Sequence, residues 1–135
     1  MEPAPLLEKV DAVTVPVPDL EAGLRFYSRA LGHTLRWRND EIGQAALGLP
    51  GSDTELVLST RLRYEPNWLV GSAGEAAERV RAAGGTVLQE PFDIPVGRVV
   101  VVADPFDNVL VLLDLSRGRY TTDESGAVTG VSDEG

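Results

Sequence analysis

The chain has 135 residues, a length that suits one domain or two small halves sharing a core. Its 21 acidic and 12 basic residues give a formal net charge of −9, and such a surface repels nucleic-acid phosphates. It has no cysteine, which excludes disulfides, thiolate metal sites and thiol nucleophiles. No apolar run approaches the roughly 20 residues that span a bilayer, and no secretory signal is recognisable. We therefore expect a cytoplasmic protein with neither nucleic-acid nor membrane partners.

The N-terminal part predicts a strand, a helix and three more strands. Valines alternate along Val10–Val17, which is typical of a strand with one face on the core. Asp19 is a good N-cap for a helix whose apolar residues recur at helical spacing until Gly32. Three shorter runs then read as strands: Thr34–Arg38, Gln44–Leu49 and Glu55–Ser59. The only histidine, His33, falls just after the helix, and we expect it to be an exposed loop residue.

The second part repeats this order. Asn67–Gly71 predicts a strand, Ala73–Ala83 a helix closed by two glycines, and Thr86–Gln89 another strand. The last two strands lie in Arg98–Leu115, where branched apolar runs flank the turn Asp104–Asn108. In the final strand apolar residues occupy both faces, so we expect neither face to be exposed to solvent.

These elements predict a duplicated α+β fold. The two helix-ending glycines, Gly32 and Gly84, are 52 residues apart, and each half reads strand-helix-strand-strand-strand. Two such βαβββ modules, over about residues 9–61 and 64–115, would form a cupped, mixed sheet with helices on the outside. Residues 1–115 would thus be a single domain, and the small polar residues 116–135 predict a flexible acidic tail.

The motifs resemble those of the vicinal oxygen chelate superfamily, which includes glyoxalase I, bleomycin-resistance proteins and extradiol dioxygenases. The resemblance covers about residues 9–115. It rests on Asp19-Leu20, Phe26-Tyr27 and Leu31-Gly32 in VDAVTVPVPDLEAGLRFYSRALG, on AAERVRAAGGTVLQEP, and on DPFDNVLVLLDL. In the last motif Asp107 stands where the family usually has glycine. The order and spacing of the motifs together carry the resemblance.

The resemblance implies a divalent cation held by His, Glu or Gln from four strands. The equivalent positions in this chain are Ala12, Val57, Glu65 and Val111. Three of these side chains offer no donor atom, and a divalent cation needs several oxygen or nitrogen donors. The sequence therefore predicts a fold without the family's metal and without another cofactor.

Polar and aromatic residues on the predicted inner strands are the candidates for ligand binding. These candidates are Arg36, Trp37, Arg38, Glu65, Asn67 and Leu69. Because successive side chains of a strand point to opposite faces, Trp68 is expected to face the helices as part of the core. For Trp37 and its two arginine neighbours, the alternation does not settle which side chains face inward.

The leading hypothesis is a binding protein of the bleomycin-resistance type, which sequesters a cationic or amphipathic small molecule and works as a homodimer. A second hypothesis is a metal-independent, glyoxalase-like isomerase or lyase that uses Glu65, Glu55 or Tyr27. A third is a regulatory or scaffold domain whose cup is filled by its own side chains. Binding without catalysis fits the acidic charge and the missing ligands best.

Overall fold

The computed structural model describes residues 3–133 and has an α+β fold with two modules of the same topology. Contacts divide the chain into two compact units. One comprises Asp11–Pro66 with Tyr120–Gly130, and the other comprises Asn67–Arg119 with the two chain ends. The predicted duplicated α+β fold is confirmed. Among the described helices, none has the length and apolar character needed to cross a membrane.

The first module is a four-stranded half-sheet with one helical segment. Its elements are β1 (Lys9–Pro16), α1 (Leu20–Leu24), η1 (Arg25–Ala30), β2 (Leu35–Asn39), β3 (Gln44–Leu49) and β4 (Ser52–Ser59). In the sheet the strands follow the order β2-β3-β4-β1, and β1 runs parallel to β4. Asp19 caps α1 as expected, because its side chain accepts a 2.7 Å hydrogen bond from the backbone N–H of Ala22. The second half of the predicted helix is a π-helix, and Gly32 follows it with a φ of 84°.

The second module has the same plan. Its elements are β5 (Glu65–Leu69), α2 (Ala73–Ala82), β6 (Thr86–Ile94), β7 (Gly97–Ala103) and β8 (Val109–Asp114). The strand order is β5-β8-β7-β6, with β5 parallel to β8. In each module, therefore, the first strand pairs with the last, which confirms the predicted repeat. Strand β6 is longer than predicted: it continues beyond Gln89 to Ile94 and includes Pro91. Its pairing with β7 shifts register on either side of Gln89.

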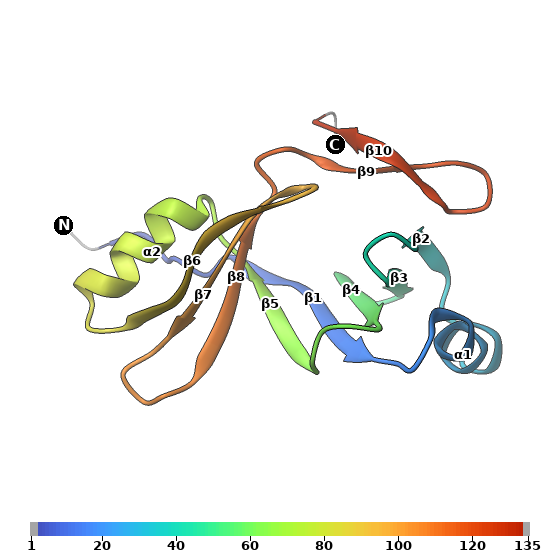
Figure 1. Ribbon diagram of the computed structural model, residues 1–135, viewed down its shortest axis with the longest axis horizontal. Coiled ribbons are helices and arrows are strands. Elements are labelled where there is room, and N and C mark those ends of the chain that lie inside the picture. The colour runs from blue at the N-terminus through green and yellow to red at the C-terminus, as the bar shows by residue number, and fades with distance from the viewer. Residues whose placement is uncertain (1–2, 134–135) are drawn as a thin grey trace. The chain divides into compact units, whose positions relative to one another are not determined.

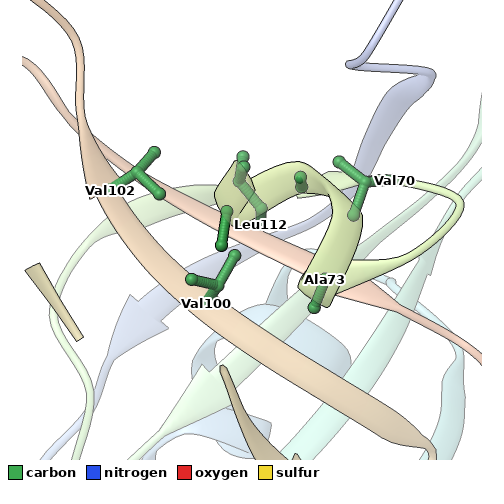
Figure 2. Packing of buried hydrophobic residues seen from close by; sticks show 7 residues of the cluster. Val70, Ala73, Val100, Val102 and Leu112 are labelled. Atoms are coloured by element: carbon green, nitrogen blue, oxygen red, sulfur yellow. The ribbon is translucent and has the colours of Figure 1, made fainter. Parts of the chain in front are cut away.

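Each module has its own apolar core between its helix and its half-sheet. In the second module, α2 packs on one face of the strands with alternate residues of β7 and β8 beneath it (Figure 1). Figure 2 shows the buried cluster of this core, which includes Val70, Ala73, Val100, Val102 and Leu112. Trp68 packs against the same cluster, which confirms its predicted place on the helix side. In the first module the corresponding core consists of Val15, Leu20, Leu24, Ala45, Leu47 and Leu58.

The C-terminal residues differ from the expected flexible tail. Residues 119–132 form a hairpin of β9 (Arg119–Thr122) and β10 (Val128–Ser132) (Figure 1). Asp123 organises the turn between them. The Asp123 carboxylate accepts hydrogen bonds from the backbone N–H groups of Ser125 and Ala127, at 2.8 and 3.2 Å. Small polar residues favoured the tail prediction, but an Asx turn between two short β-forming runs closes a hairpin here.

Candidate functional site

The best candidate site lies on the face of the first half-sheet that is turned away from α1. Its floor is an apolar cluster of Ala12, Ala46 and Val57, against which the Trp37 indole packs. Two of these floor residues, Ala12 and Val57, stand at the positions that the resemblance assigns to metal ligands. We call the side chains on this face, namely Ala12, Trp37, Asn39, Ala46, Glu55 and Val57, the Trp37 face.

A β-bulge decides that Trp37 points to this face. Leu35 packs into the core on the α1 side, and a regular strand would place Trp37, two residues later, on that same side. The register between β2 and β3 shifts between Leu35 and Trp37, so the indole emerges on the opposite face. This bulge is why the sequence left the parity of Trp37 open.

Glu55 brings a carboxylate to the Trp37 face. The indole Nε1–H of Trp37 donates a hydrogen bond of 3.2 Å to Oε1 of Glu55, and both residues are half-buried. Glu55 lies opposite Ala12 in the pairing of β1 with β4 and two residues before Val57. An aromatic face and a carboxylate in contact over an apolar floor form a surface suited to an organic cation.

The sequence analysis missed Tyr120, the residue that covers Trp37. Tyr120 lies on β9, and its ring centroid is 4.6 Å from that of Trp37 with an interplanar angle of 51°. Burial raises the pKa of the Tyr120 hydroxyl above its ordinary value, and a hydrogen bond with the Asn39 side chain partly offsets this effect. An aromatic residue before a Thr-Thr pair and an Asp-Glu-Ser-Gly turn was the signal for a strand here.

Two further residues singled out in the sequence lie away from the Trp37 face, namely the ligand-binding candidate Arg38 and the catalytic candidate Tyr27. The Arg38 guanidinium is on the α1 side, where it forms ion pairs with Glu21 at 2.8 Å and with Asp40 at 2.7 Å. These pairs lower the pKa of Glu21 and raise that of Arg38. Tyr27 packs in the α1 core and meets Phe26 edge to face, so it is separated from Glu55 by the sheet.

Arg36 lines a separate surface hollow of about 320 Å³. This hollow lies where the end of η1 and the β3–β4 turn approach each other, and His33, Gly48 and Pro50 also line it. His33 is half-buried, where we expected an exposed residue, because its Nδ1 lies 3.1 Å from the carbonyl oxygen of Gly48. The two basic side chains therefore belong to a different place from Trp37 and Glu55.

The second module presents an apolar face of its own, opposite α2. Trp68, Val100 and Leu112 face the helix, so the alternate residues of β5, β7 and β8 face away from it. Asn67 lies beside Val111 in the parallel pairing, and Leu69 lies beside Leu113. Glu65 begins β5 on this same side and is half-buried. The predicted residues Asn67 and Leu69 therefore share a face with Val111.

The donor atoms on these faces do not fit a divalent cation. Ala12 and Val57 are packed in the apolar cluster beneath Trp37, and Val111 lies among the hydrocarbon side chains of β7 and β8. Hydrocarbon groups cannot ligate metals. Within residues 3–133, no three His, Cys, Asp or Glu side chains are grouped so that they could hold an ion.

The sequence was compared with models of known protein families. The glyoxalase-like domain family matches residues 12–113, which is most of the chain and covers both modules. The protein therefore belongs to the glyoxalase-like domain family, in agreement with the resemblance drawn from its motifs.

Several solved structures have the same fold. Methylmalonyl-CoA epimerase from Mycobacterium tuberculosis is 21% identical, with a TM-score of 0.65 over 84% of this chain and 92% of the epimerase. A Streptomyces coelicolor methylmalonyl-CoA epimerase variant in complex with 2-nitronate-propionyl-CoA is 21% identical, with a TM-score of 0.61 over 80% of this chain and 97% of the other. A hypothetical protein from Bacillus halodurans is 17% identical, with a TM-score of 0.63 over 78% of this chain and 93% of the other. At such identities the likeness shows the fold alone. No curated protein matched the sequence.

Proposed function

We propose that this protein binds a small amphipathic molecule carrying an aromatic and a cationic group, without using a metal ion. The observation that carries the proposal is the composition of the Trp37 face. The indole of Trp37 packs on Ala12, Ala46 and Val57 and donates its N–H to the Glu55 carboxylate. Apolar and cationic groups of one ligand would find complementary surfaces there within a few ångströms.

Charge supports the cationic part of the ligand. The chain has a net charge of −9, which attracts cations and slows the approach of anions. Among the residues of the Trp37 face Glu55 is the only charged one, so a ligand cation there meets a carboxylate and no competing basic group. Of the two arginines that flank Trp37, Arg38 is engaged by Glu21 and Asp40 on the other side of the sheet, and Arg36 lines the separate hollow.

Calorimetric titration tests the proposal. We would titrate the protein with metal-free bleomycin and with smaller aromatic amines, using their uncharged aromatic analogues as ligand controls. We expect binding of at least one cationic aromatic, and a loss of affinity of about tenfold or more in Glu55→Gln, because a cation would lose its charged partner. Glu78→Gln on the exposed face of α2 is the matched control variant. Absence of binding across the panel would leave the third hypothesis, a domain whose site is filled by its own side chains.

A second candidate function is a metal-independent isomerase, which the fold shared with methylmalonyl-CoA epimerases favours. Glu55 or Glu65 would take a proton from the carbon next to a carbonyl, with the bonding electrons moving to the carbonyl oxygen, and a proton would return on the opposite face. Methylmalonyl-CoA incubated with the protein in D₂O provides the test. Exchange of the α-proton, followed by NMR and abolished in Glu55→Gln or Glu65→Gln but kept in Glu78→Gln, would establish this activity.

The homodimer, which the resemblance implies, and the cytoplasmic location, which was expected from the sequence composition, stay predictions. Sedimentation velocity over a range of protein concentrations would show whether two copies associate. A single species with the mass of one chain at all concentrations would contradict the dimer.

A further inference from the structure

The contact between Trp37 and Tyr120 leaves no room for a ligand ring between them. Their centroids are 4.6 Å apart, which is direct ring contact, and a third ring between the two would require about twice a stacking distance. Resting on the proposed function, we propose that Tyr120 occupies the position of the ligand's aromatic ring. The C-terminal hairpin is then a removable cover whose own tyrosine stands in for the ligand.

The residues around Tyr120 indicate which chemical groups a ligand would need in order to replace it. Its ring lies against the Trp37 indole, and its hydroxyl shares a hydrogen bond with the Asn39 side chain. The Glu55 carboxylate accepts a hydrogen bond from Nε1–H of the same indole. A ligand that reproduces the two contacts of Tyr120 and adds an ion pair with Glu55 is a hydroxylated aromatic ring with an ammonium group on a short chain. Tyramine is the simplest molecule of this class.

The hairpin is closed by its own hydrogen bonds and meets the first module along β2. Asp123 closes its turn through Ser125 and Ala127, and the hydroxyls of Thr121 and Thr129 are 2.9 Å apart across the strands. Its backbone meets the half-sheet at β2, where the Arg38 N–H donates a 2.9 Å hydrogen bond to the Gly126 carbonyl oxygen and Arg38 forms an isolated parallel bridge with Ala127. Most of its other side chains are exposed. Exposed segments near a chain end can open locally at a fraction of the global unfolding free energy.

Displacement of the hairpin has a definite effect on affinity. When a site is open only part of the time, the observed dissociation constant is the intrinsic one divided by the open fraction. Removing the tyrosine ring raises that fraction. Tyr120→Ala therefore binds tyramine about tenfold more tightly than the wild-type chain, on the scale expected for one aromatic pair. Tyr120→Phe keeps the ring but loses the hydroxyl, so its affinity for tyramine lies between those of the wild-type chain and Tyr120→Ala.

The first measurement needs no ligand. Trp68→Phe leaves Trp37 as the single tryptophan, and the change is mild because the Trp68 Nε1–H has no hydrogen-bond partner among the described residues. In this background we expect acrylamide to quench Trp37 fluorescence at least twofold more efficiently after Tyr120→Ala. Tyr64→Ala removes an exposed tyrosine that is 71% accessible and serves as the matched control. Equal quenching in the two variants would overturn the cover.

The second measurement is calorimetric titration with tyramine, which uses the natural tryptophans. Tighter binding in Tyr120→Ala than in wild type and Tyr64→Ala supports the proposal. Weaker binding in Tyr120→Ala overturns it, because Tyr120 would then be a wall of the site. If aromatic amines bind wild type and Tyr120→Ala equally, the cover is wrong and the proposed function stands. If neither chain binds any of them, the proposed function itself fails.

Discussion

Oδ2 of Asp114, at the end of β8, accepts a 2.8 Å hydrogen bond from the backbone N–H of Ala73, the first residue of α2. Its other oxygen accepts from the backbone N–H of Arg98 at 2.9 Å and from the Ser116 hydroxyl at 2.7 Å. The residue is only 3% exposed. One buried carboxylate therefore joins the helix start, the start of β7 and the turn after β8, and it satisfies a helix N-terminal donor.

We expect Asp114→Ala to lower the free energy of unfolding by about 3 kcal/mol, because buried N–H groups lose their acceptor. Urea denaturation followed by circular dichroism measures the change. Asp53→Ala in the exposed β3–β4 region is the control and should cost less than about 0.5 kcal/mol. A cost for Asp114→Ala equal to that control would contradict the anchoring role.

Asp114 also makes stability depend on pH. Burial by itself would raise the pKa of its carboxyl, but the hydrogen bonds from Ala73, Ser116 and Arg98 together bring the pKa below its ordinary value. A carboxyl whose pKa is lower in the folded state stabilises the protein above its unfolded pKa of about 3.9, and this contribution disappears as the pH falls through the folded pKa.

The stability difference between wild type and Asp114→Asn is therefore expected to be constant from pH 7 to about pH 5 and to shrink below about pH 4. Urea titrations at several pH values provide the measurement. Asp104 and Asp123 also have lowered pKa values and act in the same direction, so the comparison with Asp114→Asn isolates one group. A difference that grows toward low pH would refute the assignment.

Gly97 is required by the close approach of β8. A Cβ at this position would lie 2.1 Å from the Asp114 carbonyl oxygen and 2.7 Å from its Oδ1. Gly97→Ala is expected to cost at least about 2 kcal/mol, since the backbone must move. Gly51→Ala has no atom within 4 Å of the new Cβ and is the matched control, with no loss expected. Thermal unfolding of the two variants side by side gives the answer.

Asp107 carries the one positive φ, 69°, among the described residues other than glycine. It stands where the resemblance expects glycine, so the turn keeps its left-handed conformation with a less suitable residue. Asp107→Gly is expected to stabilise the protein by up to about 1 kcal/mol, because glycine adopts this conformation without strain. Asp107→Ala, which also removes the carboxylate but keeps a Cβ, should not stabilise it. A lower melting temperature for Asp107→Gly than for wild type would contradict this reading.

Divalent metals are expected to leave the melting temperature unchanged. Ala12, Val57 and Val111 supply no donor atoms, and an ion that bound the folded state at 100 times its dissociation constant would add about 2.7 kcal/mol of stability. Thermal-shift assays with zinc, nickel and manganese, each against EDTA, test this expectation. A clear upward shift with any of the three would show that other side chains provide a site.

The Trp37 face shows which parts of the site the sequence could not predict. Glu55 and Trp37 were both candidates, yet their hydrogen bond depends on the bulge that reverses the parity of β2, and a bulge leaves no periodic signal. Tyr120 was missed because a composition of small polar residues favours disorder, whereas its ring contacts Trp37, a residue far away in the chain. Arg38 was predicted as a ligand-binding residue, but Glu21 on α1 fixes it on the other face.

The sequence by itself determined the duplicated α+β plan and its family. Strand alternation, Asp19 as helix cap and Gly32 as helix end are local properties of the chain, and they recur at the same spacing in both modules. Only the tertiary structure decided which side chains meet at the site. Contacts such as Trp37 with Tyr120 or Asp114 with Ala73 join residues far apart in sequence, and their formation depends on strand register and burial that no local pattern encodes.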